Sequence, residues 1–139
     1  MTHVFLDTNV IIDFLADRKP FANDAASLFD RALKREIVIH VSAVSYNNIF
    51  YIMRQYGSQN EVMRMLEELF EWTEVIDVSG KIISDAMRFG FKDFEDAIQY
   101  QCALSNKKVE MIITRDSKDF KLSTLPVLTP REVISLLGF

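Results

Sequence analysis

The sequence alternates short apolar runs with longer stretches of helical periodicity, and this alternation constrains the fold more than any other feature. Residues 4–6 and 37–41 are short and rich in aromatic or β-branched side chains, as buried strands are. Because parallel strands need a crossover connection, the alternation predicts an α/β fold with helices on both faces of a mainly parallel sheet. Further strands are predicted at residues 74–78, 109–114 and 125–128, and helices at 21–35, 43–55, 79–88 and 93–105, with others beginning near residues 8, 58 and 130.

The length of 139 residues suits a single domain, so residues 1–139 are expected to fold as one unit. No apolar run reaches the roughly 18 residues of a membrane helix, and no signal peptide is recognisable at the N-terminus. Cys102 is the only cysteine, which excludes an intrachain disulfide and favours a cytoplasmic protein. The net charge of -4 argues weakly against nucleic-acid binding through bulk charge, although a bound divalent cation would change the local field.

Two acids follow predicted strands. Asp7 ends the first strand and precedes Thr8 and Asn9, which are good helix N-caps, while Asp116 follows the fourth strand. In open α/β sheets, ligands bind at this carboxyl edge, so the two carboxylates would share one crevice if their strands are neighbours. The alternative, that Asp7 only caps the next helix, is equally compatible with this segment.

A second pair of acids opens the helix predicted at residues 93–105. Asp93 and Asp96 are three residues apart and share a face, whereas Glu95 is expected to point elsewhere. Favourable interaction with the helix dipole is an alternative explanation for acids in a first turn. If Asp7, Asp96 and Asp116 converge, a cation must offset their repulsion, and carboxylate oxygens suit Mg²⁺ or Mn²⁺. Such sites commonly serve phosphoryl chemistry, whereas no Cys–His cluster indicates zinc and no Gly-rich loop indicates nucleotide binding.

Four motifs resemble those of PIN domains, and among these the VapC-type toxins. They are L-D-T-N-V at 6–10, V-S-A-V-S at 41–45, D-F-E-D-A-I-Q at 93–99 and I-T-R-D-S-K-D-F at 113–120. The resemblance implies a three-layer Rossmann-like fold with strand order 3-2-1-4-5, which places the first and fourth strands side by side. It also implies an Mg²⁺- or Mn²⁺-dependent endoribonuclease that dimerises and is blocked by a small antitoxin protein.

The resemblance assigns roles to individual residues. Asp7, Asp96 and Asp116 take the positions of the metal-binding, catalytic acids. Family members usually carry an acid, most often Glu, in the helix after the second strand, where this chain has Asn47 and Asn48. Asn48 matches the spacing best, and because an amide has no negative charge, a supporting role and lower metal affinity are expected. The further polar positions of the motifs are matched by Asn9, which would support the first acid, and by Asp93 and Asp119.

Basic residues lie near the predicted acids. Arg115 and Lys118 flank Asp116 and could contact RNA phosphates, although solvated surface charge is the alternative for each of them.

These observations predict a divalent-metal-dependent endoribonuclease, the toxin of a type II toxin–antitoxin pair. One rival is a catalytically weak or inactive PIN-like module that binds RNA or protein, which Asn48 favours. Another is a small phosphohydrolase or a receiver-like domain with an acidic pocket. A receiver should carry a Lys after its last strand, and Lys118 and Lys121 fit that poorly.

Overall fold

A computed structural model describes residues 1–139 and contains one five-stranded sheet, in which every pair of neighbouring strands is parallel. The strand order is β3-β2-β1-β4-β5, so the expected order and the expected neighbourhood of the first and fourth strands are confirmed. The third, fourth and fifth strands are shorter than predicted. The strands are β1 (Thr2–Leu6), β2 (Ile37–Ser42), β3 (Glu74–Ile76), β4 (Met111–Ile113) and β5 (Val127–Leu128).

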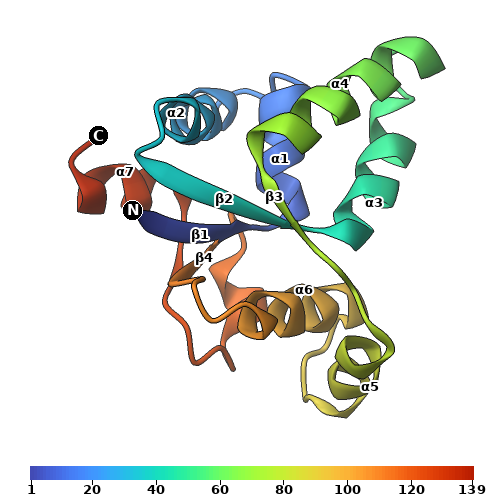
Figure 1. The fold of residues 1–139 in the computed structure, drawn as a ribbon, viewed down its shortest axis with the longest axis vertical. Helices are drawn as coiled ribbons and strands as arrows, with labels where there is room; N and C mark the ends of the chain where they lie inside the picture. The colour runs from blue at the N-terminus through green and yellow to red at the C-terminus, as the bar shows by residue number, and fades with distance from the viewer.

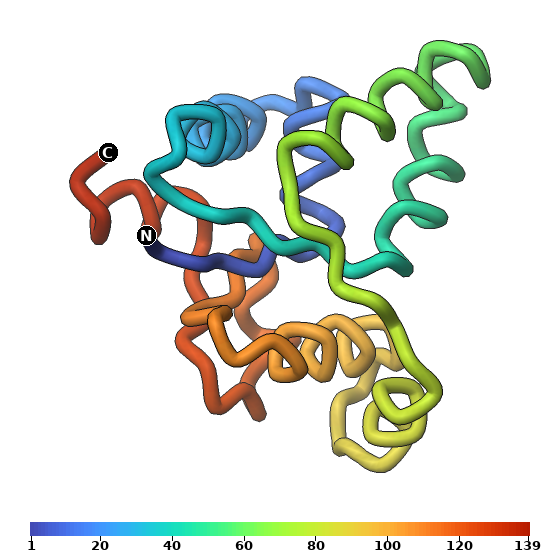
Figure 2. The backbone as a smooth tube through the Cα atoms, viewed as in Figure 1, coloured from blue at the N-terminus to red at the C-terminus, as the bar shows by residue number.

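Helices cover both faces of this sheet, as Figure 1 shows. One apolar cluster includes residues of α1, α2, α3, α4 and α7, and the other includes residues of α5 and α6. Figure 2 traces α3 and α4 as a helical hairpin that extends away from the sheet. None of the helices is long and apolar enough to cross a membrane. The helices are α1 (Thr8–Leu15), α2 (Ala22–Leu33), α3 (Ala43–Met53), α4 (Gln59–Trp72), α5 (Gly80–Arg88), α6 (Phe94–Ser105), α7 (Pro130–Leu137) and the short 3-10 helix η1 (Ser117–Phe120).

The alternation of side chains along β1 decides which layer each residue meets. Phe5 pairs with Ile112 of β4, and both belong to the cluster on the α5–α6 face. Leu6 pairs with Ile113, and both belong to the cluster on the opposite face. Since successive side chains along a strand point to opposite faces, Asp7 is expected to follow Phe5 and face α6. The strand period therefore directs the first acid toward the helix that carries Asp93 and Asp96.

The carboxyl ends of β1 and β2 lie where several helices begin. Thr8 opens α1 directly after β1, and Ala43 opens α3 directly after β2. Figure 1 shows that α3 starts above this edge of the sheet while α6 lies below it. Polar groups from three helix starts can therefore meet at one edge, as expected at the topological switch of an open parallel sheet.

Candidate active site

Asp7 both caps α1 and presents a carboxylate to the α6 side of the sheet. The backbone N–H of Thr8 donates to Asp7 Oδ1 at 2.8 Å, and Thr114 Oγ1 donates to Asp7 Oδ2 at 2.8 Å. Asp7 is only 6% exposed. Burial raises the pKa of Asp7 to about 6, with smaller increases from the charges of Glu95 and Asp116, while the two hydrogen bonds oppose the shift. Asp7 therefore caps α1 and is at the same time a buried carboxylate whose ionised form is disfavoured by burial and by neighbouring acids.

The start of α6 brings further acids toward Asp7. Asp93 is the N-cap of α6, and its Oδ1 accepts the backbone N–H of Asp96 at 3.1 Å. Burial and the nearby charge of Asp7 raise the pKa of Asp96 to about 7, with further contributions from Asp93, Asp119 and Glu95. The predicted acids on β1, α6 and η1 therefore repel one another across this edge of the sheet.

The expectation that Glu95 points away from the site was wrong. Asn48 Nδ2 donates to Glu95 Oε1 at 2.8 Å, so the side chain of Glu95 crosses from the first turn of α6 to α3. Its charge also raises the pKa of both Asp7 and Asp96. The physical reason is that the second turn of α3, which carries Asn48, faces the first turn of α6, so a side chain leaving α6 there meets a second helix.

Asp116 stands on the opposite flank of Asp7. Asn9 Nδ2 donates to Asp116 Oδ2 at 3.2 Å, and the backbone N–H of Asp116 donates to Thr114 Oγ1 at 3.1 Å. Asp116 itself is exposed, at the start of η1. The Thr114 hydroxyl therefore contacts both acids: it donates to Asp7 Oδ2 and accepts the backbone N–H of Asp116.

The donor set fits a hard divalent cation held partly by water. The Oδ1 atom of Asn9 is buried and has no hydrogen-bond partner, which leaves an amide oxygen free for a cation or water. No group of three or more Asp, Glu, His or Cys side chains is placed so that together they could hold a metal ion. Mg²⁺ usually keeps several waters and is bound through only one or two carboxylates, so an open set of oxygen donors suits it. Asp7, Asp96, Asp116 and Asn9 are the residues from which one or two carboxylates and the amide oxygen would hold such an ion together with water.

A buried brace of neutral polar groups holds the three helix starts together. Gln99 Nε2 donates to Thr8 Oγ1 at 3.1 Å and to Ser45 Oγ at 3.0 Å, and these two hydroxyls lie 2.7 Å apart. The brace links α6, α1 and α3 beneath the acids. Sequence reasoning did not single out these residues or Thr114. The available signal for Gln99 was its position three residues after Asp96, which puts both on one side of α6.

The predicted RNA-contacting residues border two hollows on the surface. Arg115 and Asp116 line a hollow of about 590 Å³, in which the Arg115 guanidinium lies 4.1 Å from the ring centroid of Phe21. The guanidinium is also held by a hydrogen-bonded ion pair to the buried Asp13. Lys118 borders the other hollow, of about 410 Å³, which is lined by Gly90, Phe91, Lys92, Asp93, Asp96, Lys118, Asp119, Lys121 and Leu122.

Comparisons with known proteins show the family and the fold of the chain. A family model described as PIN domain matches residues 3–118, and no curated protein matches the sequence. A toxin–antitoxin complex from Klebsiella pneumoniae contains a chain that is 26% identical, with a TM-score of 0.62, and the match covers 91% of this chain and 97% of that one. VapBC-1 from nontypeable Haemophilus influenzae gives 17% identity and a TM-score of 0.69, with 94% and 99% covered. The toxin VapC20 of Mycobacterium tuberculosis, described as cleaving the sarcin–ricin loop, gives 15% identity and 0.62, with 78% and 86% covered.

The family match spans the acids on β1 and α6 and the acid that opens η1. The structural similarity extends to nearly all of the sheet and its helices, because it covers more than nine-tenths of the chain in two of these cases. The chain therefore belongs to the PIN domain family, and its fold is that of the VapC-type toxins.

Proposed function

We propose that this protein is an endoribonuclease that hydrolyses RNA phosphodiesters with Mg²⁺ or Mn²⁺. The observation that carries the proposal is the meeting of Asp7 and Asp96 at the carboxyl edge of β1, each with a raised pKa and neither in an ion pair. Buried carboxylates are normally paired with a base or with a metal. Seven ion pairs form elsewhere in the molecule, so basic side chains are available to the fold and are not used here.

Each residue has a distinct task in this reaction. When bound, a divalent cation activates water and neutralises charge that develops on the phosphate. Asp7, Asp96 and Asp116 supply carboxylate oxygens to the cation, and Thr114 and the Thr8 N–H fix the orientation of Asp7. No side-chain nucleophile is required. Asn9 orients Asp116, and Lys118, with Asp93 and Asp119, forms the border along which the RNA backbone approaches.

The direct test is cleavage of a structured RNA by purified protein with Mn²⁺ or Mg²⁺, compared with the Asp7→Asn variant. We expect metal-dependent cleavage by the wild type, abolished by EDTA and lost in Asp7→Asn by more than about a hundredfold, because the substitution removes a ligand charge. Asp17→Asn is the matched control, since Asp17 is exposed, pairs only with exposed Lys19, and has a positive φ that Asn tolerates.

Equal residual cleavage by the wild type and Asp7→Asn would reject the enzyme. It would favour the alternative, a PIN-like module that binds RNA or protein without cutting, which the amide of Asn48 at the site also favours.

The biological role we propose is that of the toxin in a type II toxin–antitoxin pair, acting in the cytoplasm as a homodimer. The α3–α4 hairpin carries the exposed apolar side chains Tyr51, Met63 and Phe70, which offer a surface for a second copy or for a small antitoxin. VapBC2 from Rickettsia felis, which is similar in structure to this chain, is bound to a DNA fragment from the promoter of the pair. Growth arrest on expression, relieved by the product of an adjacent short reading frame, is the expected outcome. Harmless expression of a protein that does cleave RNA would contradict the toxin role alone.

A further inference from the structure

Glu95 is an acid at this edge of the sheet to which the proposed cleavage assigns no role. It lies in the first turn of α6, exposed, and forms none of the seven ion pairs of the molecule. Only its Oε1 atom has a hydrogen-bond partner, the Nδ2 of Asn48 on α3. The second carboxylate oxygen, Oε2, receives no hydrogen bond from the protein.

An exposed glutamate in a first turn would ordinarily extend into water, where its long side chain keeps its rotamer freedom. The contact with Asn48 instead holds it against α3, next to Asp96 in the first turn of α6. Adding an acid near carboxylates that already repel one another costs free energy unless a cation offsets the repulsion. The same site contains two buried amide oxygens without a donor, Asn9 Oδ1 and Gln99 Oε1, and Gln99 is fully buried one helical turn after Glu95.

We infer that Glu95 is a cation-binding carboxylate of this site and that Asn48 is the residue that positions it. The inference rests on the proposed metal-dependent function. The amide of Asn48 occupies the first oxygen of Glu95, leaves the second free for the cation or its water shell, and adds no positive charge that would compete with the cation. The charge absent at position 48 is thereby supplied from the facing helix α6.

The pair permits a nearly isosteric exchange that separates charge from hydrogen bonding. Glu95→Gln removes the charge and keeps the size of the side chain. The double variant Asn48→Asp with Glu95→Gln restores one carboxylate and one amide, with the carboxylate now on α3. A purely structural bridge between α3 and α6 requires only the hydrogen bond, whereas cation binding requires the charge on either side.

The experiment is calorimetric titration of metal-free protein with Mn²⁺ at about pH 8, where the acids are ionised. We expect Glu95→Gln to weaken Mn²⁺ binding by about tenfold to a hundredfold, and the double variant to recover most of the loss. Glu68→Gln, an exposed glutamate on α4 without an ion pair, is the control and should bind as the wild type does. Thermal melts in EDTA verify that each variant is folded.

The outcomes separate this inference from the proposed function. If Asp7→Asn loses Mn²⁺ binding and Glu95→Gln keeps wild-type affinity, the inference is overturned and the metal site stands. If the double variant binds no better than Glu95→Gln, the charge at this pair is not what the cation requires, and the inference is again overturned. If the wild type binds no Mn²⁺ and cleaves no RNA, both proposals fail.

Discussion

Two buried aspartates, Asp7 and Asp13, lie on the segment that runs from the end of β1 through α1, and only one of them is paired with a cation. Asp13 is 1% exposed and is bound by Arg115 through two N–H groups, with Arg18 as a second cation 3.6 Å away. Asp7 is 6% exposed and receives only neutral donors, from Thr8 and Thr114. Its charged neighbours are other acids, which raise its pKa further. One carboxylate is neutralised within the fold, and the other is left without compensation.

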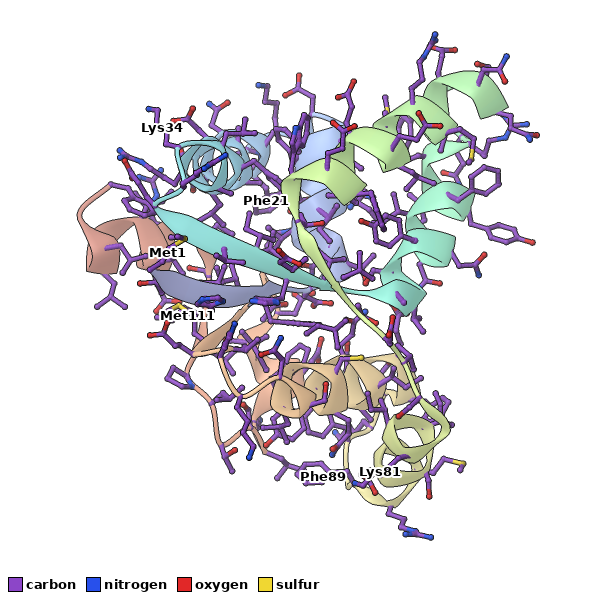
Figure 3. The ribbon with its side chains drawn as sticks, in the orientation of Figure 1. Met1, Phe21, Lys34, Lys81, Phe89 and Met111 are labelled. Carbon is purple, nitrogen blue, oxygen red and sulfur yellow. The ribbon has the colours of Figure 1, made fainter.

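The difference teaches where the fold is complete and where it depends on something outside the chain. Thr114 and Arg115 are consecutive, yet the hydroxyl of Thr114 serves Asp7 and the guanidinium of Arg115 serves Asp13. Arg115 therefore follows directly after the residue that bonds Asp7, yet its guanidinium pairs with Asp13 and not with Asp7. Since buried charges are normally paired or bound to metal, Asp13 has a structural role and Asp7 is suited to an external cation. Figure 3 shows that the labelled Lys34 and Lys81 project from opposite sides of the molecule, where they meet acids of their own helices.

The largest expected effect is a loss of stability when Asp13, the ion-paired aspartate, is substituted. Asp13→Asn should lower the free energy of unfolding by about 3 kcal/mol, because it breaks an ion pair whose carboxylate is buried and leaves the half-buried guanidinium of Arg115 without its charged partner. Urea denaturation of the metal-free protein measures it. Asp17→Asn breaks only an exposed ion pair with Lys19 and should change stability by less than about 0.5 kcal/mol. Equal losses in both variants would show that the Asp13 pair is not structural.

The next expected effect is an increase in stability, and it concerns Asp7, the aspartate without an ion pair. Asp7→Asn should stabilise the metal-free protein by about 2 kcal/mol near pH 8, because it removes a carboxylate whose pKa is raised to about 6 by burial. An asparagine can still accept the Thr8 N–H and donate to Thr114, so the two contacts remain. The same urea experiment applies, in EDTA. A destabilised Asp7→Asn would mean that the charge of Asp7 is already compensated in the fold.

The smallest expected effect is the dependence of stability on pH. The folded-state pKa of Asp7 is about 6 and that of Asp96 about 7, both above the ordinary value of 3.8. The folded protein therefore holds these protons more tightly than the unfolded chain, and stability falls as the pH rises through that window. Between about pH 5 and pH 8, we expect the melting temperature in EDTA to fall by about 3–5 °C.

Saturating Mn²⁺ should reverse this trend, because a bound cation favours the ionised carboxylates. Asp7→Asn and Asp96→Asn should each reduce the slope measured in EDTA. A melting temperature that rises over the same range in the wild type would contradict the assigned shifts.

Much of the scaffold followed from local pattern. The β-branched runs predicted the strands, and the resemblance carried by the four motifs supplied their order, which the fold confirms. The helix that the sequence predicts to begin near residue 58 starts with a complete capping box of Ser58 and Glu61, whose two partners lie within one helical turn. Asp93 and Asp96 likewise meet at the start of α6, as their spacing required.

The features that local pattern did not reveal all join distant parts of the chain. The Arg115–Asp13 pair spans 102 positions, the Thr114–Asp7 bond 107, and the Asn48–Glu95 bond 47. Helical periodicity places Glu95 off the face shared by Asp93 and Asp96, but it cannot show that Asn48 of α3 lies where that side chain emerges. Glu95 was therefore expected to point elsewhere, whereas its side chain contacts Asn48.

The sequence by itself determined that strands alternate with helices, that acids follow the first and fourth strands, and that the alternation along β1 turns Asp7 to the same side as Phe5. Only the tertiary structure decided which of two buried aspartates is neutralised and which is left for a cation. The reason is physical: the energy of a charge depends on the distance to every other charge and on the loss of water. Those distances arise only when β4 lies beside β1 and the second turn of α3 faces the first turn of α6.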